Sequence, residues 1–378
     1  MTAHVPRLNS RVLTVFLLVS LPVLILGSAV VLAFGHARLT ANYGQHLEDI
    51  AQQAAAGIDA YVYRRILDVS LLARTPELRR EAAASSRAPA DRAAADAARR
   101  GAAAMPAAAP ENAASRYLAD LIAQDRTYHE MLLTDRHGRL VAAGGPAAAR
   151  FHGEADWWRA AFDDGRQGRV SISDVHWDRG AGAHLIAIAA PVQSPEDGAL
   201  VGILRVVADS RELLALVGSL QLGETGGAWL LRRNGSVVYS RQTADPNARF
   251  FASDILTGRM KTVRESGPIG GTYFEARTPD GSDQIVGVAE SQLGASYPSL
   301  QWIVAVSQAR SELLAPVAMV GWYLGLLVGL VALIVLALAL WFSVRLAAPQ
   351  VDVDMHLVEH PQVSHVGELD EAAAHGRP

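Results

Sequence analysis

The 378-residue sequence contains no cysteine, which excludes disulfide bonds, thiolate metal ligands and a cysteine nucleophile. Charge is nearly balanced, because 34 lysines and arginines against 38 aspartates and glutamates leave a formal net charge of −4. Such a balance gives no support to nucleic-acid binding. No nucleophile, metal-ligand set, acid–base pair or phosphate-binding glycine loop stands out. We therefore expect no enzymatic activity, no metal, no cofactor and no nucleic-acid partner.

Two long apolar runs interrupt this ordinary composition. Residues 317–342 hold 26 residues without a charge, and about 20 apolar residues suffice for a helix to cross a bilayer. Trp322 and Tyr323 near one end, and Trp341 at the other, suit the two membrane interfaces. A buried core helix is the alternative, but the length of the run favours a transmembrane helix, within an exit-helix segment spanning 309–344.

The second run, residues 12–34, follows Arg7 and Arg11. A cleaved signal peptide is the alternative, but the apolar stretch is longer than is usual for one, and the Gly-His after Phe34 is a poor cleavage site. We predict a first transmembrane helix here, and Pro22 is tolerable inside it.

Two spans place both termini on one side of the membrane. Arg7, Arg11 and Arg345 flank the spans on that side and indicate the cytoplasm. Residues 1–11 and 345–378 are then a cytoplasmic N-terminus and a short cytoplasmic tail, and residues 35–316 are extracytoplasmic. The expected location is the inner membrane of a bacterium, as a multi-pass protein in contact with the lipid bilayer.

Apolar residues recur every three or four positions from residue 38 to about 80, which predicts one long helix within a stalk segment spanning 35–81. Its apolar stripe can serve as a dimer face or pack only on its own domain, and the pattern leaves both open. Residues 82–114 follow as an alanine-rich insertion with little to bury, which indicates loosely helical or disordered chain.

From residue 115 the pattern changes to short strands and helices. Two strands, 130–134 and 139–143, are joined by the turn sequence Asp-Arg-His-Gly. Further strands are expected at 168–177, 184–192 and 200–208, and helices at 117–126, 156–163 and 210–220.

The pattern then recurs. LLTDRHGRLVAA around Gly138 matches WLLRRNGSVVYS around Gly235, an offset of 97 positions. ILRVVADSRELLALV at 203–217 matches IVAVSQARSELLAPV at 303–317, an offset of 100. Self-similarity at a nearly constant offset indicates a duplication. We predict two copies of one α/β unit, a membrane-distal unit at 115–220 and a membrane-proximal unit at 221–308.

Two such units behind a long helix resemble the double Cache sensors of bacteria, which are PAS-like extracytoplasmic domains of chemoreceptors and sensor histidine kinases. The resemblance covers about residues 36–316 and is carried by LLTDRHGRLVAA, DWWRAAFDDG, VSISDVHWD, HLIAIAAPV, LGETGGAWLLRRNGSVVYS and PSLQWIVAVSQARSELLAPV. It implies an α+β fold, with two tandem PAS-like antiparallel-sheet units on a long N-terminal helix, flanked by two transmembrane helices. It also implies a homodimer, and a small-molecule ligand in the distal unit.

Five residues of the distal unit are candidate ligand contacts: Trp157, Trp158, His176, Asp178 and Arg205. Arg205 interrupts the apolar strand GILRVV, where an unpaired charge is costly, and its guanidinium fork suits an anionic ligand. A structural ion pair or an outward-facing residue is the alternative. The two tryptophans can be core or pocket wall, or one of each.

In the amino-acid-binding members of that family, an arginine precedes the matching tryptophan by two residues and an acidic residue stands on the last strand. Ala155 and Val207 occupy those positions here. The resemblance therefore does not imply an amino acid held in the usual way.

The tail sequence Arg-Leu-Ala-Ala-Pro from Arg345, and His-Val-Gly-Glu-Leu from His365, resemble the two helix starts of a HAMP signalling domain, shortened to a remnant. The expected function is a membrane-anchored sensor that binds a small solute and signals to a separate cytoplasmic protein. The alternatives are the input half of a histidine kinase or chemoreceptor without its output domain, and a non-signalling envelope binding or scaffold protein.

Overall fold

The computed structural model describes residues 10–88, 108–145, 149–243, 245, 247–266 and 273–345. Most of the expected alanine-rich insertion, and the tail after Arg345, lie outside these residues. By compactness the chain divides into a sheet-bearing unit, residues 30–322, and a terminal unit formed by residues 1–29 and 323–378. The two are described separately, and the domain boundaries expected from the sequence stay predictions.

Helix α1 (Ser10–Leu72) is followed by a separate helix, α2 (Pro76–Ser86). The expectation of one helix from 38 to about 80 was therefore wrong in its C-terminal part. Proline at the start of α2 restricts the preceding residue, and Thr75 accordingly takes an extended ψ of 131°. The break comes where Pro76 cannot continue the α1 hydrogen-bond ladder.

The distal sheet has the strand order β2-β1-β6-β5-β3, and β4 also pairs with β5. All its pairings are antiparallel. Its strands are β1 (Tyr128–Asp135), β2 (Leu140–Ala143), β3 (Ser171–Ile172), β4 (His176–Asp178), β5 (Ala183–Gln193) and β6 (Leu200–Asp209), and its helices are α4 (Ala113–Gln124), α5 (Asp156–Phe162) and α6 (Arg211–Gly218). The single strand expected at 168–177 is in fact two short strands.

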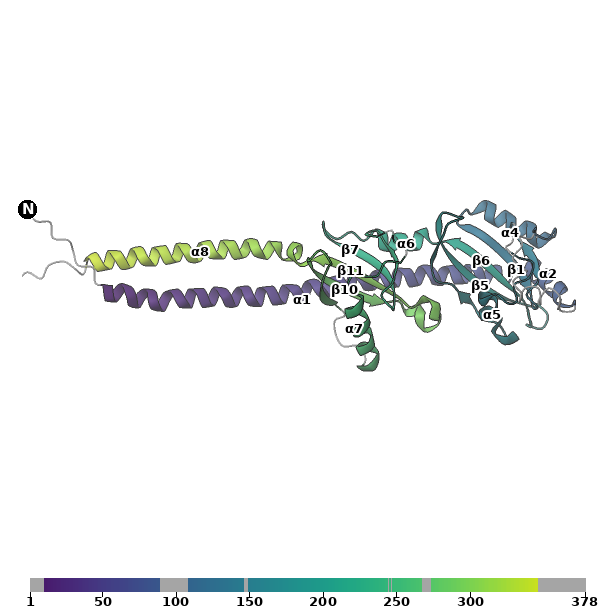
Figure 1. The fold of residues 1–378 in the computed structure, drawn as a ribbon, viewed down its shortest axis with the longest axis horizontal. Coiled ribbons are helices and arrows are strands. Elements are labelled where there is room, and N and C mark those ends of the chain that lie inside the picture. The colour runs from purple at the N-terminus through teal and green to yellow at the C-terminus, as the bar shows by residue number, and fades with distance from the viewer. Residues whose placement is uncertain are drawn as a thin grey trace, which may run out of the picture. The chain divides into compact units, whose positions relative to one another are not determined.

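The proximal sheet repeats this order as β8-β7-β11-β10-β9, and Figure 1 labels its central strands β7, β11 and β10. Its strands are β7 (Gly227–Arg232), β8 (Val237–Ser240), β9 (Tyr273–Arg277), β10 (Asp283–Glu290) and β11 (Trp302–Ala309), accompanied by α7 (Ser253–Ser266) and followed by α8 (Arg310–Arg345). Strands matched by the sequence repeat, such as β6 with β11, occupy the same place in each sheet. The α+β fold with a long N-terminal helix and two antiparallel sheets is thus as expected.

Helix α1 backs both sheets. Its buried residues Leu47, Ile58 and Val69 belong to one apolar cluster that also contains Ile188 of the distal sheet and Val304 of the proximal sheet. Burying this shared stripe supplies the main driving force that joins the two sheets into one unit.

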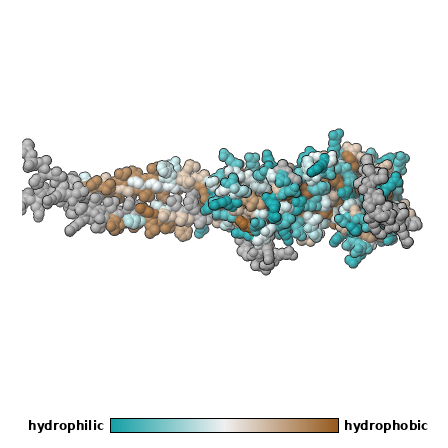
Figure 2. Space-filling model, in the orientation of Figure 1, coloured by the Kyte–Doolittle hydropathy of each residue, from teal (hydrophilic) through white to brown (hydrophobic). Residues whose placement is uncertain are grey.

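Among the described residues, one helical stretch, Ala318–Leu338 of α8, is long and apolar enough to cross a membrane, and none of it is buried. Figure 2 shows the apolar surface of this helix in brown. The first part of α1 also exposes large apolar side chains, including Leu18, Leu26 and Phe34. A second span at 12–34 stays a prediction.

Candidate functional site

A cavity of about 510 Å³ lies in the distal unit, between the sheet and helix α5. That volume is within the range of small-molecule sites, roughly 300–1,000 Å³. Its lining comes from α5, from the β3–β4 segment and from the facing strands: Asp156, Trp157, Ala160, Ser171, Ile172, Ser173, His176, Ala187, Ala189 and Arg205.

Strand alternation explains why there is space on this face. Side chains two residues apart share one face of a sheet, so Ala187 and Ala189 of β5 point the same way. Arg205 of β6 pairs directly with Ala189. Two alanines opposite one long side chain leave room under α5, whereas the other face carries the larger Ile186 and Ile188 against the core.

Arg205 is the charged group of this cavity. Its Nη1 donates to Glu130 Oε2 at 2.8 Å, and the two side chains are 20% and 32% exposed. Its guanidinium carbon lies 5.3 Å from the ring centroid of Trp157, a cation–π distance. Its Nε is buried and has no hydrogen-bond partner. A buried donor without a partner costs free energy. The Arg205 side chain borders the cavity, and its guanidinium can donate to an acceptor atom that enters there.

The two adjacent tryptophans of α5 lie in different environments. Trp157 lines the cavity, whereas Trp158 is 6% exposed and belongs to the core. Trp158 Nε1 donates to Thr134 Oγ1 at 2.9 Å, and its ring stacks on Phe162. Successive helical side chains diverge by about 100°, which accounts for one core and one pocket tryptophan.

His176 lines the cavity from β4, but Asp178 does not. The Asp178 carboxylate instead accepts from the backbone N–H of Ala181, at 2.8 Å, in the turn that follows β4. The structure thus brings Trp157, His176 and Arg205 together and leaves Trp158 and Asp178 outside their cavity. Ligand contact by any of the five stays a prediction.

Two residues near the cavity were missed by the sequence analysis. Glu130 is the ion-pair partner of Arg205. His152 is 7% exposed, its ring centroid lies 5.6 Å from that of Trp157, and its Nε2 has no hydrogen-bond partner. Burial lowers the pKa of His152, and the nearby Glu130 carboxylate opposes that shift. Neither residue lies in a motif, so the sequence carried no signal for them.

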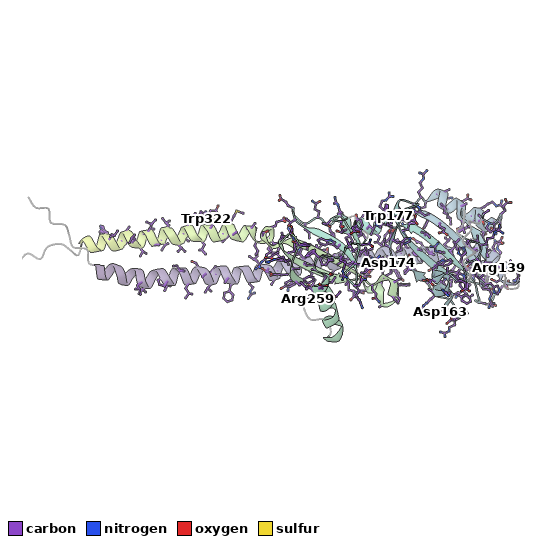
Figure 3. The ribbon with its side chains drawn as sticks, in the orientation of Figure 1. Arg139, Asp163, Asp174, Trp177, Arg259 and Trp322 are labelled. Atoms are coloured by element: carbon purple, nitrogen blue, oxygen red, sulfur yellow. The ribbon has the colours of Figure 1, made fainter. Side chains whose placement is uncertain are left out.

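A larger cleft of about 880 Å³ lies between the distal and proximal sheets, and His176 borders it as well. Figure 3 labels Asp174 and Trp177 in the region between the two sheets. Trp177 is 51% exposed there and meets His184 edge-on, with 4.9 Å between ring centroids. In the described part of the chain, no three His, Asp or Glu side chains gather as a metal site.

The protein-family comparison matches residues 36–317 to a family described as "Cache domain". The methyl-accepting chemotaxis protein McpA of Pseudomonas putida is 26% identical over 156 residues, which is 41% of this chain and 22% of that protein. The match therefore spans about a fifth of this curated relative.

Solved structures of similar fold include the ligand-binding domain of the Pseudomonas aeruginosa amino-acid chemoreceptor PctC, in complex with GABA. It is 18% identical with a TM-score of 0.47, and the match covers 70% of this chain and 99% of that one. The extracellular domain of the putative histidine kinase mmHK1S-Z3 is 13% identical with a TM-score of 0.46, covering 72% and 97%.

Proposed function

Because the chain belongs to the Cache domain family over residues 36–317, we propose that it is a membrane-anchored extracytoplasmic sensor. It binds a small solute in the distal cavity and passes the signal across the membrane to a separate cytoplasmic protein. It acts by binding and not by catalysis. The observation that carries this proposal is the Arg205 guanidinium beside Trp157 in a cavity of ligand size.

The cavity chemistry favours a small solute with an acidic group. A guanidinium offers planar, forked donors that match a carboxylate. The Trp157 ring and the alanines of β5 provide an apolar wall for the rest of the molecule. Ser171, Ser173 and His176 add polar groups on the opposite wall, which can fix the orientation of the solute.

The proposed membrane arrangement has two spans, residues 12–34 and 317–342, in a bacterial inner membrane, with residues 35–316 outside the cytoplasm. The apolar, unburied Ala318–Leu338 supports the second span. The exposed Leu18, Leu26 and Phe34 of α1 support the first. Residues 345–378 would then reach the cytoplasmic partner.

We further propose a homodimer formed along α1. Tyr63, Leu67 and Leu71 are 56%, 45% and 65% exposed. Their spacing of four residues places them on one face of the helix. A stripe of large apolar side chains on a water-exposed helix is typical of an interface, and a second copy would present the same stripe.

The test is a thermal-shift screen of the full chain in detergent micelles, against acetate, succinate, benzoate, GABA, L-amino acids and neutral sugars. A solute that binds only the folded state raises its stability by about 2.7 kcal/mol at 100 times the Kd. We expect hits among the carboxylates, lost in Arg205→Ala and weakened in Arg205→Lys, which keeps the charge without the fork.

The matched control is Arg277→Ala, which removes an exposed arginine paired with Asp283 on the proximal sheet. This variant should keep the hits. A well-folded chain that responds to no member of the panel would instead favour an envelope scaffold that senses no solute.

A further inference from the structure

Residues 171–176, called the β3–β4 segment, contact both the candidate solute cavity and the proximal sheet. Ser171, Ile172, Ser173 and His176 line the candidate solute cavity. Asp174, in the middle of the same segment, contacts the proximal sheet instead. The segment is attached to its own sheet by Ser173, whose backbone N–H donates to Ala187 O at 2.8 Å.

The Asp174 carboxylate accepts two hydrogen bonds from the proximal sheet. Arg232 Nε donates to Oδ2 at 2.5 Å, and Trp302 Nε1 donates to Oδ1 at 2.9 Å. Arg232 and Trp302 are paired residues on the adjacent strands β7 and β11. Ser299 Oγ, just before β11, also donates to Ile172 O at 2.5 Å. The segment is therefore fixed to the start of β11 at two points.

The two hydrogen bonds to the Asp174 carboxylate are charge-assisted. Hydrogen bonds to an ionised carboxylate are about twice as strong as neutral ones. Trp302 is 1% exposed and its indole has only a donor. Removing the carboxylate would leave that buried N–H without its partner.

Strand β11 continues into the membrane-directed helix without a break. Ala309 ends β11 and Arg310 begins α8. Glu312 in the first turn of α8 accepts from the backbone N–H groups of Glu224 at 2.9 Å and Thr225 at 3.0 Å. A displacement at Trp302 therefore has a continuous, hydrogen-bonded path to α8.

We propose that Asp174 couples the solute cavity to β11 and α8, a role that rests on the proposed function of that cavity. A solute between Trp157 and the β3–β4 segment displaces the wall formed by Ser171–Ser173. Because Asp174 is fixed to Arg232 and Trp302, the displacement passes to the β7–β11 pair. The sheets are also connected through α1, which backs both, and through α6 and the chain that follows it. Asp174 adds a hydrogen-bonded link that starts within the cavity-lining segment itself.

The absence of cysteine makes the test specific. A single Ala160→Cys substitution on α5 places a thiol in the cavity of the otherwise cysteine-free chain. The 2-sulfonatoethyl methanethiosulfonate reagent then tethers a small anion there: the thiolate attacks the sulfenyl sulfur of the thiosulfonate, a mixed disulfide forms, and methanesulfinate leaves. Hydrogen exchange of the full chain in lipid nanodiscs measures the response of β7 and β11. The labelling control is Glu196→Cys, which carries the same anion on the exposed β5–β6 turn, outside the cavity.

We expect the tethered anion in Ala160→Cys to change exchange in the β3–β4 segment and also in β7 and β11. Adding Asp174→Ala should keep the first change and remove the second, and should raise basal exchange near Trp302 about tenfold. Asp174→Asn is the milder variant, since its amide oxygen still accepts from Trp302 but the ion pair with Arg232 is lost. It should weaken the β11 response.

The control pair is Arg233–Glu290, which lies beside Arg232 but within the proximal sheet. Glu290→Gln should leave the β11 response intact. A β11 response that survives both Asp174 variants would overturn the proposal, as would a tethered anion that changes nothing in β11 of the parent. Because the occupant is tethered, these results do not depend on the solute screen, whose failure would count against the sensor function alone.

Discussion

Glu130 competes with any acidic solute for Arg205. The affinity for carboxylates should therefore rise when the charge of Glu130 is removed. Glu130 Oε2 lies 2.8 Å from Arg205 Nη1. Replacing Glu130 with Gln keeps the shape and a hydrogen-bond acceptor but removes the negative charge beside the cavity. We expect Glu130→Gln to bind carboxylates more tightly than the parent chain.

The magnitude follows from the geometry. Two unit charges about 4 Å apart interact by about 4 kcal/mol at an effective dielectric constant of 20. Both side chains are partly exposed, at 20% and 32%, so water screens the interaction and the gain should be about 1–2 kcal/mol. That corresponds to a five- to thirtyfold lower Kd, roughly.

Isothermal titration of the full chain with the strongest carboxylate of the solute screen measures this change. Glu196→Gln, an exposed carboxylate on the β5–β6 turn, is the control and should leave the Kd unchanged. A carboxylate without an amino group that binds equally well or worse to Glu130→Gln would refute the assignment of Arg205 as the anion-binding group. A solute that instead uses Glu130 to hold an ammonium group would give that weaker binding.

The remaining predictions concern stability, assembly and pH. Asp135→Ala should lower the free energy of unfolding by about 3–5 kcal/mol in urea titrations, because it removes a fully buried carboxylate that accepts from Arg139, Ser85 Oγ and the His137 backbone N–H; a loss below 1 kcal/mol would contradict this. Leu67→Asp on the exposed stripe of α1 should convert dimer to monomer in sedimentation, whereas Asp68→Asn, also exposed, should not; an unchanged dimer would place the interface elsewhere. Burial lowers the pKa of His152 and holds the ring neutral. The Arg205 charge also lowers this pKa, whereas the Glu130 carboxylate raises it. Protonation is therefore easier in the unfolded chain, so stability should fall as pH drops below about 6.5, and His152→Phe should flatten that part of the pH profile in thermal melts.

Much of the fold could be predicted because it depends on local pattern and on repetition. The offset of 100 between residues 203–217 and 303–317 predicted equivalent strands, and β6 and β11 hold equivalent places in their sheets. The strand expected at 168–177 failed for a tertiary reason. Residues 173–175 leave the strand so that Asp174 can reach Arg232 and Trp302, and those partners lie far along the chain.

The candidate site, like the fold, could be predicted from the sequence only in part. Arg205 was conspicuous because a charge interrupts an apolar strand. Its partner depends on which strand lies alongside and in which register. Leu132 is opposite Arg205, and an irregularity between Tyr128 and Glu130 shifts the register at the start of β1. Such long-range pairing is set by the packed sheet, so Glu130 could not be assigned from local sequence.

The two sheets differ at the position that corresponds to the candidate solute cavity. The position equivalent to Arg205, at an offset of 100, is Ala305, which is fully buried. The corresponding region of the proximal sheet is filled by an apolar cluster in which Trp229 and Phe250 meet, with ring centroids 5.2 Å apart. A filled core transmits a displacement because close-packed interiors have low compressibility. The distal sheet thus has a polar, partly empty face at this position and the proximal sheet a packed apolar one. Under the proposed coupling, the packed sheet would carry a displacement of Asp174 towards α8.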